Sequence, residues 1–236
     1  MATTTIEVIS DPICSWCFLA HRVLLKAVQL YRRTVPNGSA DHFNIIYLPY
    51  YLLDPATPLA DKQELKDQSR NPRNRDRAYT RITQIGRAYG ISFNFSDGKI
   101  GGTREAHRLI QLAQSRQSRE VRDRILEGIF SAFHEKALDI TDWDVLRSIA
   151  IGAGMQAKEV DEWKDDKNIG AEQLDFELGR ARELVDDADT RGVPVVLVQG
   201  KYRFDGAPDV AELLEAFSSI KNGNDEVQNH TSAGQC

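Results

Sequence analysis

Two cysteines separated by two residues, Cys14 and Cys17, constrain the fold of this chain more than any other feature. A strand-like run over residues 5–9 precedes them, and an apolar, helix-like run over residues 18–25 follows. The pair is therefore predicted to lie where a strand leads into a helix. Backbone N–H groups at a helix N-terminus are unpaired and carry partial positive charge, which stabilises a thiolate. We expect the pKa of the Cys14 thiol to fall from about 8.5 into the range of about 3.5–7.5.

This arrangement predicts a redox-active pair. Cys14 is expected to be the exposed nucleophile, and Cys17, one helical turn deeper, is expected to resolve a mixed disulfide. The structural alternatives are two unrelated buried cysteines or half of a zinc site. The chain has no second Cys-x-x-Cys, and its five histidines show no metal-ligand spacing, so no metal site is predicted.

Composition excludes several classes of protein. The 236 residues suffice for one large domain, or for one domain with an inserted lobe. A net charge of -5 argues against a nucleic-acid-binding protein, and no apolar run approaches the length of a membrane span. The N-terminus has no secretory signal pattern, so a cytoplasmic location is expected. Cys236, at the end of a polar tail, is interpreted as an incidental thiol.

The order of the predicted elements indicates a discontinuous α/β domain. A strand at 5–10, a helix that ends before Pro36 and a strand at 43–48 form a βαβ unit. Apolar helix faces then follow one another at 106–113, 125–133, 145–150 and 174–185, with no strand between them. Strand patterns return at 195–198 and 201–204 around Gly200, before a last helix that starts near Pro208. We predict an α/β domain over 1–50 and 190–221, a helical domain over 51–189, and a disordered tail over 222–236.

Several segments together resemble the DsbA-like thioredoxin superfamily, and within it the FrnE-like branch. The resemblance implies a thioredoxin-like α/β fold with an inserted all-helical lobe, and thiol–disulfide oxidoreductase activity. It also implies that Cys14 attacks, that Cys17 resolves, and that a cis peptide before Pro194 faces the pair. One residue departs from the family pattern, because Ser15 stands where a proline is usual, so the reduction potential cannot be carried over. The matching segments are residues 14–20, 106–109, 130–140, 192–194, 200–202 and 206–207.

The resemblance also implies the remaining site residues and partners. The expected partner is a thiol- or disulfide-bearing protein or small molecule, with glutathione as the candidate co-substrate. Neither a metal nor an organic cofactor is expected, and both a monomer and a homodimer are compatible with the sequence. The expected substrate-binding residues are Ser15, Trp16, Val193, Pro194 and His107.

Two other functions remain open at this point. One is a glutathione-dependent isomerase or transferase that acts on a small aromatic or polyketide-like molecule. Relatives of that kind usually have serine at the first active position and lack the second cysteine, so the intact pair argues against it. The other is a redox-inactive binding or chaperone-like module.

A run of arginines also has two interpretations. It could bind an anionic substrate or the carboxylates of glutathione, or it could be a solvated helix face, since acidic residues precede it and interleave with it. The run consists of Arg70, Arg73, Arg75, Arg77, Arg81 and Arg87.

Overall fold

The computed structural model describes residues 3–67, 71–186, 192–223 and 228–231, so Arg70 and Cys236 lie outside the described residues. The chain separates into two compact units. The first unit comprises residues 1–10, 16–50 and 180–236, and the second comprises residues 11–15 and 51–179. This division differs from the expected one in two places. Residues 11–15 group with the second unit, and that unit ends at residue 179 instead of 189.

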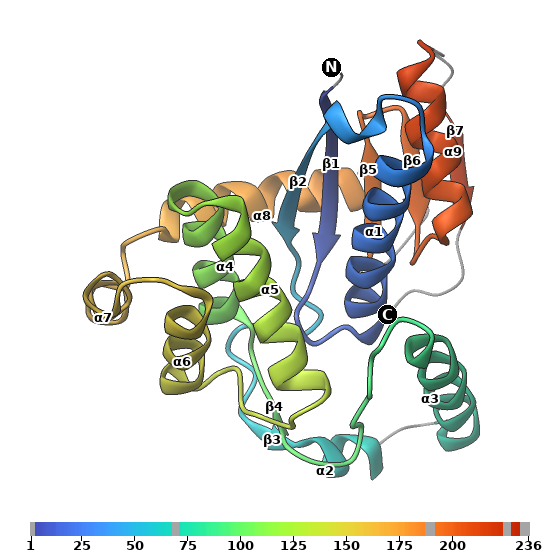
Figure 1. Ribbon diagram of the computed structural model, residues 1–236. Coiled ribbons are helices and arrows are strands. Elements are labelled where there is room, and N and C mark those ends of the chain that lie inside the picture. Colours follow the sequence, from blue (N-terminus) through green and yellow to red (C-terminus); the bar gives the residue numbers. More distant parts are fainter. Residues whose placement is uncertain (1–2, 68–70, 187–191, 224–227, 232–236) are drawn as a thin grey trace. The chain divides into compact units, whose positions relative to one another are not determined.

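The first unit is built on a five-stranded sheet in the order β2-β1-β5-β6-β7 (Figure 1). Strand β1 pairs parallel with β2, as in a βαβ unit, and antiparallel with the central strand β5. Strand β6 pairs antiparallel with β5 and parallel with β7. The strands are β1 (Thr3–Ser10), β2 (His42–Pro49), β5 (Val195–Val198), β6 (Tyr202–Asp205) and β7 (Gln228–Thr231).

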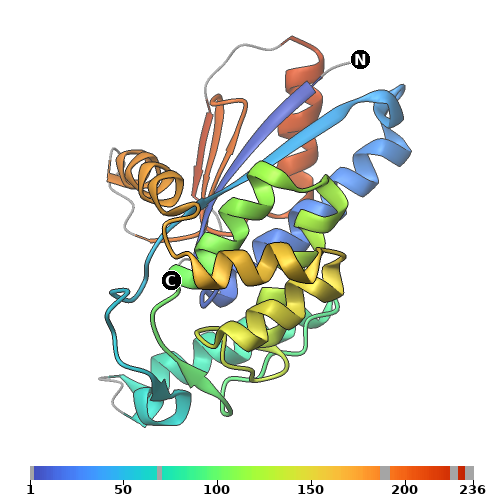
Figure 2. The same ribbon diagram turned by 90° about the vertical axis from the view of Figure 1, so that its left-hand side faces the viewer.

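Helices cover both faces of this sheet. Helices α1 (Ser15–Thr34) and α9 (Val210–Lys221) lie on one face, and the C-terminal part of α8 (Ala171–Asp186) lies on the other (Figure 2). A short 3₁₀ turn, η1 (Gly38–Ala40), follows α1. The rings of Tyr31 on α1 and Phe217 on α9 meet edge to face at 5.8 Å, which joins the two helices in one core.

The hairpin predicted around Gly200 is confirmed. Gln199 and Gly200 have positive φ angles of 54° and 65°, and the N–H of Lys201 donates to the carbonyl of Val198 at 3.0 Å. Two consecutive positive φ angles define the type I′ turn, whose twist matches that of antiparallel strands, and glycine adopts such angles without steric cost.

The predicted disorder of the C-terminal tail does not hold for Gln228–Thr231, which form β7. Without β7, strand β6 would be the edge of the sheet and would present unpaired backbone groups. The ring of His230 stacks on that of Phe204, with centroids 5.0 Å apart. Backbone pairing and this ring contact therefore outweigh the polar composition of the segment.

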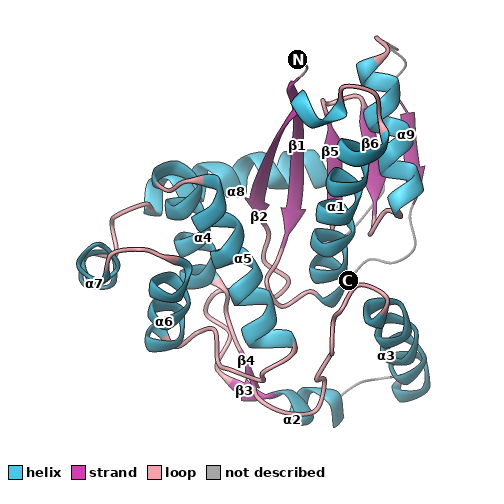
Figure 3. Cartoon of the chain, viewed as in Figure 1, coloured by secondary structure: helices cyan, strands magenta, loops and turns pink. Residues whose placement is uncertain are grey.

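The second unit is helical, as predicted, apart from a two-residue ladder between β3 and β4 (Figure 3). Arg108 is 1% exposed, and it donates to the carbonyls of Trp163 and Ile169 at 2.7 and 3.1 Å, which ties α4 to the segment around α7. No helix within the described ranges is long and apolar enough to cross a membrane. The elements are β3 (Ala60–Asp61), α2 (Lys62–Asp67), α3 (Pro72–Arg87), β4 (Lys99–Ile100), α4 (Arg104–Arg116), α5 (Arg119–His134), α6 (Trp143–Ala153), α7 (Ala157–Asp165) and the N-terminal part of α8.

Candidate active site

The two cysteines lie at the start of α1, as predicted. Ser15 is the first helical residue, so Cys14 occupies the N-cap position and Cys17 lies in the first turn. The backbone N–H of Cys14 donates to the carbonyl of Asp11 at 3.0 Å, which closes a turn through Pro12. The first turn of α1 contains no acidic residue. Its partial positive charge is therefore not offset by a neighbouring carboxylate on that turn.

The burial of Cys14 contradicts the prediction of an exposed nucleophile. Cys14 and Cys17 are not joined in a disulfide, and each is 0% exposed. The turn that precedes α1 is the physical reason, because Asp11 and Pro12 are themselves buried and hold the Cys14 backbone inside the protein. A substrate can reach either sulfur only after a movement of the groups that cover it.

Asp11 is a buried carboxylate three residues before Cys14. Its Oδ1 accepts the N–H of Ile13 at 3.2 Å, and its Oδ2 accepts the N–H of Leu52 at 2.8 Å. Burial raises the pKa of Asp11 from 3.8 to about 7, although both backbone N–H groups favour the charged form. Asp11 therefore holds the turn in place and also titrates close to neutral pH.

His107, a predicted substrate-binding residue on α4, lies beside Asp11. Its Nε2 is 3.8 Å from Asp11 Oδ1, which is too long for a hydrogen bond but close enough for an electrostatic interaction. His107 is 2% exposed, and its ring meets that of Tyr51 edge to face at 5.4 Å. In this conformation His107 contacts the carboxylate behind the Cys14 turn and is closed to bulk solvent.

His134, the last residue of α5, supports the same turn. Its Nε2–H donates to the carbonyl of Pro12 at 3.0 Å, and the rings of Phe93 and Phe133 meet its ring edge to face at 5.7 and 4.8 Å. Burial, with a smaller contribution from the charge of Lys62, lowers the pKa of His134 from 6.5 to about 3. His134 is therefore a neutral hydrogen-bond donor at physiological pH.

Lys62 adds a partly buried amine to this region. Its Nζ donates to the carbonyl of Phe133 at 2.6 Å and lies 3.8 Å from the centroid of the Phe133 ring. Burial lowers the pKa of Lys62 from 10.5 to about 8, against the opposing charge of Asp97. Three groups near the Cys14 turn, Asp11, His134 and Lys62, thus have pKa values far from their ordinary ones, as is common at functional sites.

Two of the other predicted substrate-binding residues, Ser15 and Trp16, directly follow Cys14, and the other two, Val193 and Pro194, lie in the first unit. Ser15 is part-exposed, and Trp16 is 8% exposed. The Val193–Pro194 peptide is cis, as the resemblance implied, and both residues are buried in the first unit. Their role in binding substrate stays a prediction.

Sequence reasoning assigned no role to Asp11, His134 or Lys62. Asp11-Pro12 is a turn signal that could have identified the first of them, because an aspartate side chain often accepts backbone N–H groups in turns. His134 and Lys62 gave no comparable signal. They are 120 and 48 residues beyond Cys14 in the sequence, and only the fold of the second unit brings His134 to Pro12.

Comparison with known proteins assigns the chain to a family. Residues 5–218 match the family model of the DSBA-like thioredoxin domain. The chain belongs to this family. No curated protein matches the chain.

Solved structures of DsbA-like proteins share the fold across nearly the whole chain. A probable DsbA oxidoreductase from Streptomyces coelicolor is 20% identical, with a TM-score of 0.74, and the match covers 93% of this chain and 90% of that one. The cytosolic disulfide reductase DsbM from Pseudomonas aeruginosa, solved with GSH, is 14% identical, with a TM-score of 0.61 and coverage of 92% and 99%. A 2-hydroxychromene-2-carboxylate isomerase is 16% identical, with a TM-score of 0.61 and coverage of 93% and 97%. At these identities the matches show the DsbA-like fold, and not a shared activity.

The hydrogen bond from His134 to Pro12 leads to a testable prediction. His134→Phe keeps an aromatic ring among the neighbouring phenylalanines but removes the donor, which leaves the buried Pro12 carbonyl unpaired. We expect the variant to be less stable than the wild type by about 2 kcal/mol at pH 7, measured by urea unfolding. The matched control is His42→Phe at an exposed position, where the change should stay within about 0.5 kcal/mol. Equal stabilities of the two variants would contradict this role of His134.

Proposed function

We propose that this chain is a thiol–disulfide oxidoreductase of the FrnE-like branch of the DsbA-like family. The observation that carries the proposal is the retention of both cysteines at the start of α1, with Cys14 at the N-cap. A thiolate at an N-cap can accept the N–H groups of the first turn, and this lowers the free energy of the reactive anion.

The proposed reaction proceeds by two exchanges. The Cys14 thiolate attacks one sulfur of a substrate disulfide, which forms a mixed disulfide with Cys14 and releases the first substrate thiolate. The Cys17 thiolate then attacks the Cys14 sulfur, which forms the Cys14–Cys17 disulfide and releases the second substrate thiolate. Each released thiolate takes a proton from solvent or from a neighbouring acid, and the substrate is reduced by two electrons while the pair is oxidised.

Glutathione is the proposed reductant that then restores the pair. One molecule attacks the Cys14–Cys17 disulfide and forms a mixed disulfide with one of the two cysteines, and a second molecule releases that cysteine and leaves as glutathione disulfide. The cytoplasmic location expected from the sequence favours this direction, since a glutathione pool keeps cytosolic thiols reduced. The description of the Pseudomonas relative as a cytosolic disulfide reductase with GSH also supports it. In this proposal substrate is bound by Ser15, Trp16, Val193, Pro194 and His107.

The test is the redox equilibrium of the pair. A Cys236→Ser protein, which has only Cys14 and Cys17, is equilibrated in buffers of defined glutathione ratio, trapped by acid and alkylated. Intact mass spectrometry then counts the free thiols. We expect a reversible transition in which both thiols disappear together, as a two-electron couple requires.

Two other results would overturn the proposal. A glutathione adduct that accumulates on Cys14 with Cys17 still free would favour the glutathione-dependent isomerase or transferase. Two free thiols at every glutathione ratio, after brief unfolding and refolding to give the reagents access, would favour a redox-inactive binding module.

A further inference from the structure

Helix α5 ends at the turn that holds Cys14. The last residue of the helix is His134, whose ring donates to the carbonyl of Pro12 at 3.0 Å and also hydrogen-bonds to the backbone of Cys14. The last carbonyls of a helix together carry a partial negative charge of about half an elementary charge. This negative end lies beside the turn and opposes the formation of a thiolate at Cys14.

The ammonium group of Lys62 lies against this negative end. Its Nζ donates to the carbonyl of Phe133, the penultimate residue of α5, at 2.6 Å. Nζ is also 3.8 Å from the centroid of the Phe133 ring, whose face attracts a cation. The backbone N–H of Lys62 donates to the carbonyl of Gly98 at 3.0 Å, which fixes the start of α2 at this place. Both the main chain and the side chain of Lys62 therefore hold its charge at the end of α5.

The charge of Lys62 also acts on the residue that contacts the turn. After burial, this charge is the second cause that lowers the pKa of His134. The ammonium group is thus close enough to influence a ring that hydrogen-bonds to Pro12 and Cys14. His134 is uncharged at neutral pH, so the positive charge on this side of the turn comes from Lys62. These residues all belong to the second unit.

Groups of both signs surround Lys62 and the turn. Within the described residues they include Asp61 and Lys99 on the β3–β4 ladder, Asp97 before β4, His134 on α5, and Asp11 with His107 at the turn. Asp61 and Lys99 are exposed, so solvent screens their charges. The charge of Asp97 favours the protonated form of Lys62, but burial has the larger effect and lowers the pKa of Lys62 to about 8.

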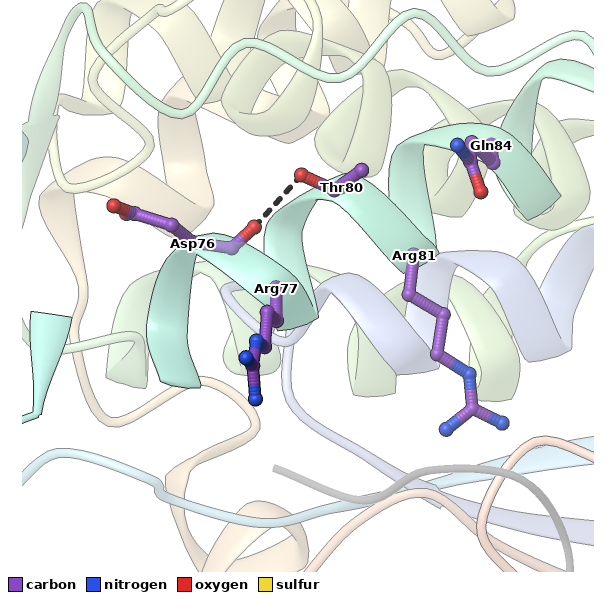
Figure 4. A pocket seen from close by; sticks show the side chains of 5 residues that line it. All are labelled: Asp76, Arg77, Thr80, Arg81 and Gln84. Atoms are coloured by element: carbon purple, nitrogen blue, oxygen red, sulfur yellow. Dashed lines mark hydrogen bonds between the residues drawn. The ribbon is translucent and has the colours of Figure 1, made fainter. Parts of the chain in front are cut away.

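The arginine run brings more positive charge to the second unit, but at an exposed place. Of the residues of α3 only Ile82 and Gly86 are buried, and Figure 4 shows the side chains of Arg77 and Arg81 extending from one side of the helix. This arrangement favours the interpretation of the run as a solvated helix face. Salt screens such charges beyond about 10 Å, whereas it screens a partly buried charge such as that of Lys62 much less.

We propose that Lys62 is a positioning residue for Cys14, whose ammonium group offsets the negative end of α5 and lowers the free energy of the Cys14 thiolate. The proposal rests on the proposed oxidoreductase function and adds a residue to it. A unit charge that acts over roughly 10 Å at an effective dielectric constant of about 20 shifts a pKa by about one unit. The coupling is reciprocal, so the Cys14 thiolate must favour the protonated form of Lys62 by the same amount.

The pH profile of Cys14 alkylation measures the coupling in one direction, in a background in which the other two cysteines are serine. Lys62→Met keeps an unbranched apolar side chain against the Phe133 ring but removes the charge, so the midpoint should rise by about one pH unit. Lys62→Arg keeps the charge and should restore the wild-type midpoint. The matched control is Lys158→Met on α7, the same change at a side chain that is 90% exposed, and it should leave the midpoint in place.

The titration of Lys62 measures the coupling in the other direction and needs no catalysis. NMR of the full chain with ¹³C-labelled lysine follows the Lys62 side chain against pH, and the resonance is identified by its loss in Lys62→Arg. We expect the pKa of Lys62 to be about one unit higher in the reduced wild type, where the thiolate is present, than in Cys14→Ser.

The two proposals fail separately. Shifts in both experiments without turnover of any disulfide would leave the role of Lys62 standing and refute the oxidoreductase. An unchanged value in either experiment would overturn the role of Lys62, and so would a midpoint that rises equally in Lys62→Arg. A lower alkylation rate at every pH with an unchanged midpoint would show that Lys62 only stabilises the end of α5. If Lys62→Met does not fold, the comparison of Lys62 titration between the wild type and Cys14→Ser decides the matter.

Discussion

Cys17→Ser is expected to stop turnover and to leave the protein as a stable mixed disulfide through Cys14. The serine hydroxyl cannot displace the bound substrate thiol, so the first exchange occurs and the second does not. The measurement is intact mass spectrometry after incubation with hydroxyethyl disulfide, in a Cys236→Ser background so that each adduct belongs to the pair.

Cys14→Ser is the matched variant, and it should form no adduct and show no turnover. Exposure does not distinguish the two thiols, since both are 0% exposed. Their positions do, because Cys14 is at the N-cap of α1, where first-turn N–H groups stabilise a thiolate, and Cys17 is inside the first turn. An adduct on Cys17 in the Cys14→Ser variant would show that Cys17 can attack a disulfide, and would contradict the assignment of Cys14 as the attacking thiol.

The sequence predicted most of the elements because their patterns are local. The hairpin at Gly200, the βαβ unit and the amphipathic helices each have a periodicity or a turn residue that acts within a few positions. Strand β7 was missed because it depends on the unpaired edge of β6, which no local pattern of residues 228–231 reveals.

The environment of Cys14 was harder to predict than its position. Its place at the start of a helix follows from the flanking residues, but its burial does not. The turn is held by Leu52 and His134, which come from distant parts of the second unit. The burial of His21 was not evident from the sequence for the same reason. His21 is 1% exposed, and its Nδ1 is 2.6 Å from the hydroxyl of Tyr47 on β2, a partner that only the sheet topology supplies.

Asp11→Asn is expected to change how stability depends on pH. In the folded protein the pKa of Asp11 is about 7, above its ordinary 3.8, so the folded state binds a proton more tightly than the unfolded state does. The contribution of Asp11 to stability is therefore full below pH 4 and is lost as pH rises to about 7, at about 1.4 kcal/mol per pH unit.

His134 has the opposite effect over nearly the same range. Its folded pKa is about 3, below its ordinary 6.5, so the unfolded state binds the extra proton and stability is lost as pH falls from 6.5 towards 3. In the wild type the two slopes offset each other between about pH 4 and 6.5. Lys62, with a folded pKa of about 8 and an ordinary value of 10.5, titrates above this window.

Asp11→Asn removes the contribution of Asp11 to the pH dependence of stability and leaves that of His134. Its free energy of unfolding should rise by about 3 kcal/mol from pH 4.5 to 6.5, whereas the two groups together leave the wild type nearly level over that range. The loss of one backbone hydrogen bond to the side chain lowers the whole curve by about 1–3 kcal/mol without changing its slope. Urea unfolding at four pH values between 4.5 and 8 measures both effects.

Asp165→Asn, at an exposed position of α7, is the control and should follow the wild-type curve. Parallel curves for Asp11→Asn and the wild type would show that Asp11 does not carry the proton that its burial implies.

Asp11→Asn also tests the reactivity of Cys14, since an ionised Asp11 places a negative charge in the turn where the Cys14 thiolate forms. Removal of that charge should shift the pH profile of Cys14 alkylation to lower pH, because the thiolate then forms without a second buried anion beside it. A merely structural effect on the turn would change the rate at every pH and leave the midpoint of the profile in place.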